Sequence, residues 1–211
     1  NPNGSLTSVR LGNGRWETTE YNSRQQARKV GLGASAGHTG IWQVDYELGE
    51  LQTNGTVDAT KNSGNVAKQT IIVPNVGTNT GFTAVQSFTF DQLDRLKVAK
   101  EVVGSTTKWQ QTYLYDRYSN RRFDATNTTT INTQLPTNQS NPGADDDNNK
   151  FTESDDYFYD ASGNLIEDAF GNRFEYDAHG KTSKFFDEAN SSSDPDAVYT
   201  YDGEDRRVKK V

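Results

Sequence analysis

The stretch that decides the fold is YFYDASGNLIEDAFGNRFEYDAHGK, which spans residues 157–181. Three segments within it begin with Asp and end with Gly, at 160–163, 168–171 and 177–180. An Asp that opens a type I turn caps backbone amides with its carboxylate, and a Gly that closes the turn adopts the left-handed conformation that other residues resist. Since only four or five residues separate successive turns, the stretch predicts a continuous antiparallel meander of very short strands.

One pattern recurs beyond this stretch: an aromatic residue, any residue, a second aromatic residue and Asp, followed by a turn. Aromatic residues two positions apart point to the same face of a strand, so each copy predicts a strand with rings on one side. A degenerate sixth copy begins at Tyr21-Asn22. The five clear copies are Phe88–Asp91, Tyr113–Asp116, Tyr157–Asp160, Phe174–Asp177 and Tyr199–Asp202. The residues expected to define the repeat are Phe90, Asp91, Tyr115, Asp116, Tyr159, Asp160, Gly163, Tyr176, Asp177, Gly180, Tyr201 and Asp202.

Other segments also predict strands. Asn13-Gly14 and Asn54-Gly55 are hairpin signals, and Gln69–Val73 is an aliphatic strand that ends before Pro74. The β-branched residues of Val98–Val103 favour a strand over a helix. For Ser23–Val30, a short helix and another repeat arm both remain open. The expected fold class is all-β: a repetitive strip of antiparallel β-hairpins with long loop insertions.

The regularity of the repeats divides the chain into two regions. Residues 1–87 form a divergent hairpin region, and residues 88–211 form the regular repeat region. A segment rich in Thr, Asn and Asp interrupts the second region at about residues 125–150, and we expect it to be a surface loop insertion.

Composition raises the question of how the chain builds a core. Leu, Ile, Val and Phe make up only 39 of 211 residues and the net charge is −7, which is typical of disordered chains. Aromatic residues, however, make up 11% of the chain, too many for a disordered tract. Rows of rings distributed along repeated strands would provide a core without an aliphatic centre, with stability supplied by neighbouring repeats.

The absence of whole residue types excludes several kinds of site. With no Cys, the chain has no disulfide, thiolate metal site or Cys nucleophile. It has no Met, even at position 1, so we expect it to start inside a larger gene product or after processing. A pI near 4.9 disfavours a nucleic-acid partner, and no apolar run is long enough to span a membrane.

No motif predicts catalysis. His179 occupies a turn position beside Gly180, and His38 lies in a Gly-rich loop that lacks the spacing of a phosphate-binding loop. Turn capping explains the repeated Asp residues without a substrate. We therefore expect a non-enzymatic protein without a cofactor.

Two weaker signals concern ions and glycans. The run that begins at Asp145 matches several positions of a calcium-binding loop, but Lys150 stands where that loop requires Gly, which favours a solvated acidic loop. Sequons for N-glycosylation occur at Asn3, Asn54, Asn127, Asn138 and Asn190.

The repeated units resemble YD repeats, the building block of the Rhs (rearrangement hotspot) family, whose relatives include teneurins and the shell subunits of Tc toxins. The resemblance rests on the Tyr-Asp or Phe-Asp pairs named above and on their turns, and it covers residues 88–211 most closely. It implies a strip of β-hairpins that spirals into a hollow shell. It implies an architecture and no activity.

We therefore expect a structural segment of an extracellular or cell-surface protein, which forms the wall of a shell around a cargo or of a self-assembled filament. Its partners would be flanking repeats of a longer chain, copies of itself or an enclosed cargo, with no nucleic acid and no membrane span. The alternative is a carbohydrate-binding adhesin in which Trp16, Trp42 and Trp109 stack on surface glycans.

Overall fold

The computed structural model describes residues 4–129, 141–152, 155–190 and 192–211. The chain divides into two compact units, one of residues 1–114 and 123–135 and the other of residues 115–122 and 136–211. All regular structure in the described residues is β-strand apart from one short 3-10 helix, η1, at Ala59–Lys61. The all-β prediction is confirmed.

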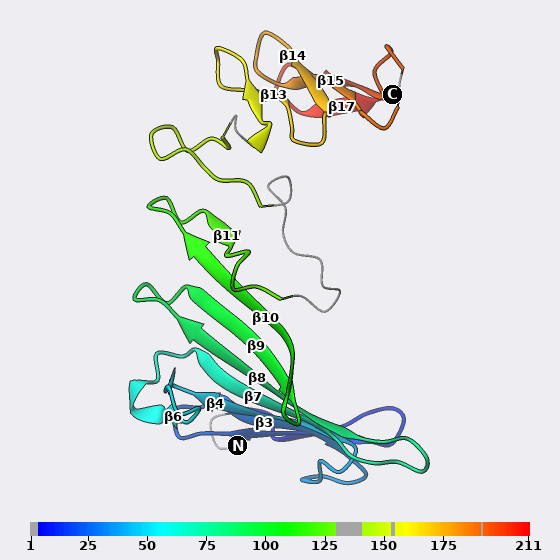
Figure 1. The fold of residues 1–211 in the computed structure, drawn as a ribbon. Coiled ribbons are helices and arrows are strands. Elements are labelled where there is room, and N and C mark those ends of the chain that lie inside the picture. Colours follow the sequence, from blue (N-terminus) through cyan, green and yellow to red (C-terminus); the bar gives the residue numbers. More distant parts are fainter. Residues whose placement is uncertain (1–3, 130–140, 153–154, 191) are drawn as a thin grey trace. The chain divides into compact units, whose positions relative to one another are not determined.

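The first unit is built on strands β1 to β10 of a nine-stranded sheet, which has the order β1-β2-β3-β4-β7-β8-β9-β10-β11 (Figure 1). Each pairing with a known register is antiparallel, so the sheet is a meander in which sequence neighbours are spatial neighbours. A small two-stranded sheet, β5 with β6, interrupts the meander between β4 and β7. The strands are β1 (Ser8–Arg10), β2 (Trp16–Tyr21), β3 (Ala27–Gly33), β4 (Trp42–Leu48), β5 (Glu50–Leu51), β6 (Val57–Asp58), β7 (Val66–Val73), β8 (Phe82–Phe90), β9 (Leu96–Val103), β10 (Thr106–Tyr115) and β11 (Arg121–Phe123).

The second unit is built on a six-stranded antiparallel meander with the order β12-β13-β14-β15-β16-β17. Its strands are only two to five residues long, as the close spacing of the turns predicts. The strands are β12 (Phe158–Tyr159), β13 (Leu165–Glu167), β14 (Arg173–Tyr176), β15 (Thr182–Phe186), β16 (Ala197–Tyr201) and β17 (Arg207–Lys210).

Most local expectations from the sequence agree with these elements. Asn13-Gly14 connects β1 to β2, Asn54-Gly55 connects β5 to β6, and residues 98–103 belong to the strand β9. Residues 23–30 form a turn and the start of β3, so the repeat-arm interpretation holds and the helix does not. The expected boundary between the divergent region (1–87) and the regular repeat region (88–211) falls inside the strand β8. One continuous sheet therefore contains strands of both regions.

The expected insertion at about residues 125–150 is partly attached to the first sheet. Thr129 exchanges two backbone hydrogen bonds with Gln110 of β10, and Thr128 is buried with its hydroxyl oxygen accepting a bond from the backbone N–H of Thr112. Residues 130–140 lie outside the described part of the chain. The start of this segment therefore extends the pairing along β10 instead of forming a free surface loop.

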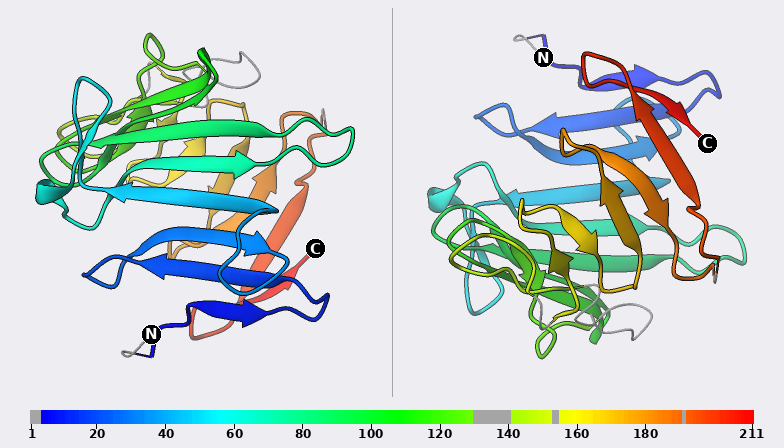
Figure 2. Two further views of the ribbon diagram at one scale, coloured as in Figure 1. Left: turned by 90° about the horizontal axis from the view of Figure 1, so that it is seen from below. Right: turned by 90° about the horizontal axis from the view of Figure 1, so that it is seen from above.

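Each of the two large sheets is a single layer of strands (Figure 2). Residues paired directly across antiparallel strands share a face. One cross-strand row is apolar over five successive strands of the nine-stranded sheet, with Thr19 and Thr106 at its two ends. Its apolar residues are Val30, Val44, Ile71, Ala84 and Val103.

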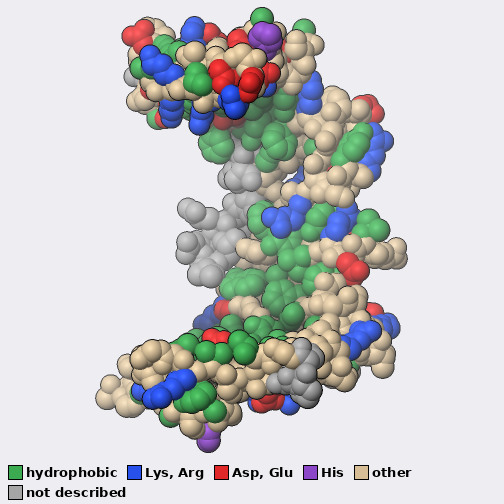
Figure 3. All heavy atoms as spheres, turned by 180° about the vertical axis from the view of Figure 1, so that it is seen from behind, with side chains coloured by type: hydrophobic (Ala, Val, Ile, Leu, Met, Phe, Trp, Pro, Cys, Tyr) green, Lys and Arg blue, Asp and Glu red, His purple; other side chains and the backbone are tan. Residues whose placement is uncertain are grey.

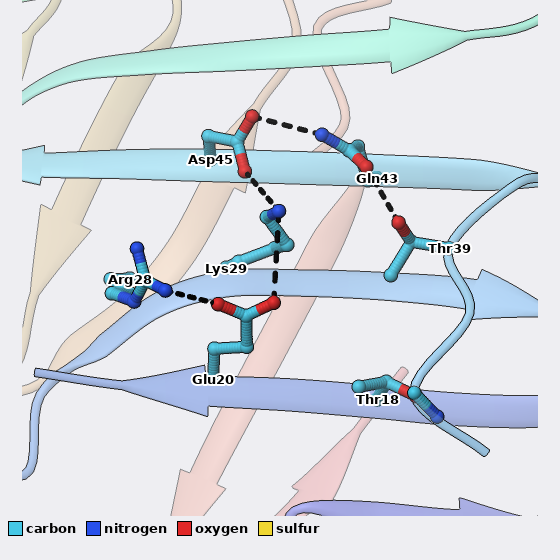
Figure 4. A network of polar contacts seen from close by, with 8 residues as sticks. Thr18, Glu20, Arg28, Lys29, Thr39, Gln43 and Asp45 are labelled. Atoms are coloured by element: carbon cyan, nitrogen blue, oxygen red, sulfur yellow. Dashed lines mark hydrogen bonds and ion pairs between the residues drawn. The ribbon is translucent and has the colours of Figure 1, made fainter.

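The opposite face of the nine-stranded sheet carries a charged network (Figure 4). Lys29 lies 3.6 Å from a carboxylate oxygen of Glu20 and 3.8 Å from one of Asp45, and Arg28 pairs with Glu20 at 2.5 Å. Gln43 donates a hydrogen bond to Asp45 at 2.9 Å. These pairs are partly exposed, so they favour solubility of this face more than they add stability.

The hydrophobic core is thin. Among the described residues, the buried hydrophobic side chains are Val44, Ala67, Ala84, Ala99, Tyr113, Tyr157, Ala169 and Ala197. Five of these eight are alanine, so no large aliphatic centre exists, and hydrophobic side chains also reach the surface (Figure 3). The low aliphatic content thus corresponds to partly buried side chains spread along single-layer sheets.

Candidate functional site

The recurring feature of both sheets is a five-residue turn closed by two backbone hydrogen bonds. In the turn that begins at Asp160, the Asp160 N–H donates to the carbonyl of Asn164 at 2.9 Å, and the Gly163 N–H donates back to the carbonyl of Asp160 at 3.0 Å. In the described part of the chain, this arrangement occurs at seven positions with the side chain of the first turn residue as the cap. We call these the capped turns, and they begin at Asn22, Asp91, Asp116, Asp160, Asp168, Asp177 and Asp202.

The first side chain of each capped turn holds the turn together. Oδ1 of Asp160 accepts hydrogen bonds from the backbone N–H of the third residue, Ser162, at 2.9 Å and of the fifth, Asn164, at 2.8 Å. Oδ2 accepts a third bond from the side chain of Asn164 at 2.9 Å. The backbone part of this cap is repeated in every capped turn.

Asn22 shows that the degenerate sixth copy is a complete capped turn. Its side-chain oxygen accepts from the N–H groups of Arg24 and Gln26 at 2.9 and 3.0 Å, as the Asp oxygens do elsewhere. Its amide nitrogen donates to the side chain of Gln26 at 2.9 Å. An uncharged side chain therefore satisfies the cap.

The fourth residue of each capped turn has a left-handed backbone. Gly163, Gly171 and Gly180 have φ between 73° and 87°. The other four capped turns place a residue other than glycine there, namely Gln25, Asp94, Ser119 and Asp205, with φ between 57° and 69°. Since this conformation is unfavourable for side chains other than Gly, Asn and Asp, the cap and the strand pairing determine the turn even without glycine.

Hydrogen bonding lowers the pKa of the capping carboxylates of Asp160, Asp177 and Asp202. The side-chain bond from Asn164, and then its backbone N–H, lower the pKa of Asp160 from its ordinary value. The backbone N–H of the fifth residue is the largest cause that lowers the pKa of Asp177 and of Asp202. An ionised carboxylate that accepts two or three such bonds acts as a structural acceptor.

At several capped turns, the hydroxyl of the tyrosine before the turn connects consecutive hairpins. The hydroxyl of Tyr176 donates to the carbonyl of Leu165 at 2.8 Å, and that of Tyr201 donates to the carbonyl of Thr182 at 2.9 Å. The hydroxyl of Tyr21 makes the corresponding bond to the carbonyl of Leu6 at 3.1 Å. Each bond links a strand to the chain of the strand before it.

One repeat was missed in the sequence because a hairpin is inserted into its turn. Strands β4 and β7 pair Leu48 with Val66 after a one-residue register shift, as Tyr176 pairs with Thr182 in a capped turn. The Gly49 N–H donates to the carbonyl of Asn65 at 3.4 Å, so Gly49 and Asn65 hold the first and fifth turn positions. Residues 50–64, which include β5, β6 and η1, replace the three residues between them.

Three cavities among the described residues have the same construction. Each cavity lies between a turn and the first strand of the next hairpin, and we call it a hairpin notch. The strand side of the three notches is formed by Tyr46 and Leu48, by Phe88 and Phe90, and by Phe174 and Tyr176, in cavities of about 370, 390 and 630 Å³. The position of the notch is thus determined by the repeat.

The other candidates from the sequence stay apart. His38 is exposed in the connection between β3 and β4, and His179 is exposed in a capped turn, where its N–H donates to Asp177. Asp145 caps its own turn by accepting from the N–H groups of Asp147 and Asn148. Within the described ranges, no three His, Asp or Glu side chains are grouped so that they could hold a metal ion.

The aromatic and sequon candidates are dispersed as well. Trp16, Trp42 and Trp109 are half-buried in β2, β4 and β10. Asn54 and Asn127 are exposed, whereas Asn3 and Asn138 lie outside the described residues. The described residues contain no helix long and apolar enough to cross a bilayer.

Comparison with known proteins gives a result at the level of the fold. No family model and no curated protein match the sequence. A chain in a structure of the Photorhabdus luminescens Tc holotoxin pore that carries a TccC3 mutation aligns with 99% of this chain, at 17% identity and a TM-score of 0.51. This chain shares the fold of a Tc holotoxin chain. A chain in the crystal structure of TcdB2-TccC3-Cdc42 aligns with 93% of this chain, at 13% identity and a TM-score of 0.42.

The match covers only a small part of each solved chain. This chain spans about a tenth of the length of the solved chains, 10% of the first and 9% of the second. The likeness therefore concerns a short segment of a much longer chain. It agrees with the resemblance to Tc-toxin shell proteins that the repeats suggest.

Proposed function

We propose that this chain is a non-enzymatic wall segment of a YD-repeat protein of the Rhs type, which forms part of an extracellular, toxin-associated shell. The observation that carries the proposal is the series of seven capped turns in the described residues, which repeat one set of hydrogen bonds along two single-layer sheets. The fold shared with a Tc holotoxin chain supports the same assignment.

The chemistry of the repeats favours a structural role. The capping carboxylates of Asp160, Asp177 and Asp202 accept two backbone N–H groups each and have lowered pKa values, so their lone pairs are committed to the turns. A general acid or base needs a pKa close to the working pH instead. The residues that recur most regularly therefore serve the wall.

Open sheet edges explain why such a segment requires neighbours. The strand β17 is exposed along its whole length and carries Arg207, Lys209 and Lys210. Basic side chains on an edge strand oppose nonspecific pairing, while flanking repeats of a longer chain continue the sheet. The wall is completed by flanking repeats of the parent chain or by copies of this segment.

Electron microscopy tests the proposal. The chain is imaged at increasing concentration, alone and extended by the flanking repeats of its parent gene. We expect curved walls, closed shells or filaments made of β-strips. If both proteins remain compact monomers at every concentration, the wall function is wrong.

A further inference from the structure

The largest hairpin notch lies beside Tyr176, between the capped turns that begin at Asp160 and Asp177. It is an open cavity of about 630 Å³. Phe174, Glu175 and Tyr176 of β14 line it, together with Gly180 of the turn that follows. A half-buried ring beside two turn carboxylates combines an apolar surface with negative charge.

One hairpin earlier in the chain, the equivalent position is filled by a lysine. The ammonium of Lys150 lies 4.9 Å from the ring centroid of Tyr159, the residue that precedes the capped turn of Asp160. The same nitrogen would be 3.0 Å from a Cβ placed on Gly163, the left-handed residue of that turn. The lysine thus occupies the space between the ring and the turn.

The neighbouring Phe151 strengthens this arrangement. Its ring lies 4.8 Å from the ring of Tyr157, centroid to centroid, and its N–H donates to the hydroxyl of Tyr159 at 3.1 Å. Lys150 and Phe151 therefore cover both aromatic residues of the repeat. The lysine places a cation over the ring of Tyr159, and the phenylalanine packs its ring against that of Tyr157.

The surroundings of Tyr159 and Tyr176 differ in the residue that closes the preceding turn. Lys150 provides the carbonyl that closes the turn of Asp145 at its sixth residue, and Asn164 provides the one that closes the turn of Asp160, which is one residue shorter. Asn164 is shorter, and its side-chain oxygen would stay 3.9 Å from a Cβ placed on Gly180. The notch at Tyr176 is open because asparagine does not reach over the ring.

The electrostatics of the open notch favour a cation. Among the described residues that line it, none is Lys or Arg, while Asp160 and Asp177 are carboxylates whose hydrogen bonds lower their pKa. Elsewhere in the same sheet, the guanidinium of Arg207 lies 5.3 Å and the ammonium of Lys210 lies 5.9 Å from the ring centroid of Tyr199. Rings of this sheet are thus covered by cations where the chain supplies them.

We propose that the notch at Tyr176 binds a Lys or Arg side chain of an extended partner polypeptide, seated over the ring as Lys150 is seated over Tyr159. The aliphatic stem of the incoming side chain lies along Phe174 and Tyr176, and its charged end lies between the ring and Gly180. An aromatic residue next to the cation adds the contact that Phe151 makes. The proposal concerns the 211-residue chain by itself and holds whether or not the chain forms a wall.

The test is an NMR titration of the full chain with the pentapeptide Asn-Asn-Lys-Phe-Thr, which copies residues 148–152. We expect saturable shifts at the Gly180 amide, and affinity that is about threefold to tenfold weaker when Gln replaces Lys in the peptide. A control titration uses a neutral glucan hexasaccharide. Shifts at Gly180 with the hexasaccharide and none with the peptide would overturn the proposal in favour of a glycan site.

Two variants locate the site. Asn164→Lys places a lysine where Lys150 stands in the earlier repeat, and it should weaken peptide binding at least tenfold. Asn172→Lys makes the same change at the fifth residue of the Asp168 turn, and it should leave the affinity for the peptide unchanged. Lys is tolerated at this turn position, since Lys181 occupies it in the turn of Asp177. Lys150→Ala should open a second site, seen as new shifts at Gly163. Equal affinity in the Asn164→Lys and Asn172→Lys variants would contradict the proposal.

Discussion

The hydroxyl of Tyr176 on β14 donates a 2.8 Å hydrogen bond to the backbone carbonyl of Leu165 on β13. Leu165 is paired with Tyr159 in the preceding hairpin, and Thr182, which is paired with Tyr176, accepts the same bond from Tyr201. The tyrosine before the turn of Asp177 is therefore attached to the residue that follows the turn of Asp160, and the tyrosine before the turn of Asp202 to the residue that follows the turn of Asp177. This arrangement gives the Tyr of a Tyr-Asp pair a role that Phe, found at position 90, cannot fill.

Replacing Tyr176 by Phe should remove this link while preserving the ring. We expect Tyr176→Phe to lower the stability of the six-stranded sheet by about 1 kcal/mol, the usual net value of a hydrogen bond. Hydrogen exchange resolved by peptide is the suitable measurement. The three tryptophans lie in the nine-stranded sheet, so their fluorescence does not report on this unit.

Tyr199→Phe is the matched control for this prediction. Tyr199 lies in the same sheet, and its interactions with Arg207 and Lys210 involve the ring and not the hydroxyl. It should therefore change exchange rates little. Equal effects of the two substitutions would show that the hydroxyl of Tyr176 does not link the hairpins.

The caps predict a difference between Asn and Ala at the first turn position. Asp160→Asn should preserve most of the protection of the β12–β13 hairpin, because Asn22 makes the same two bonds to backbone N–H groups in its own turn. Asp160→Ala removes the acceptor of both, so exchange at Ser162 and Asn164 should become severalfold faster. Equal exchange in the two variants would mean that strand pairing alone maintains the turn.

Acid should loosen the capped turns that begin at Asp160, Asp177 and Asp202. The folded-state pKa values of Asp160, Asp177 and Asp202 are lowered, so their contribution to stability is present above the ordinary pKa of 3.8 and is lost as the pH falls through the lower folded values. We expect increasing amide exchange in these turns, corrected for its intrinsic pH dependence, below about pH 3.8. The Asn22 turn has an uncharged cap and serves as the internal reference. If it loosens in parallel with the others, the cause is general acid unfolding.

The sequence predicts the capped turns well because their hydrogen bonds lie within five consecutive residues. Asp160 and Asn164 satisfy each other locally, so the pattern of residue types is sufficient, and the same holds for the degenerate copy at Asn22. The meander follows, because turns this close leave no room for another connection.

The notches and the inserted hairpin could not be predicted in this way. The notch at Tyr176 depends on the length of Asn164, which belongs to another hairpin, and no pattern within one repeat records that contact. Gly49 and Asn65 hold the first and fifth positions of one turn although 15 residues separate them in sequence. The pairing of Leu48 with Val66 becomes apparent only from the register of the sheet.

The register of β4 and β7 makes the inserted hairpin dispensable for the sheet. Replacing residues 49–65 by Asp-Ala-Ser-Gly-Asn, the turn found at 160–164, should restore a capped turn between Leu48 and Val66. Closing the shorter loop is favourable by roughly 1 kcal/mol, which offsets the lost pairing of β5 with β6. We expect an unchanged or higher denaturation midpoint by tryptophan fluorescence, and a lower midpoint when Gly-Ser-Gly-Ser-Gly, which lacks the cap, is inserted instead. Loss of cooperative unfolding in the Asp-Ala-Ser-Gly-Asn variant would show that residues 50–64 are part of the fold and not an insertion into a repeat.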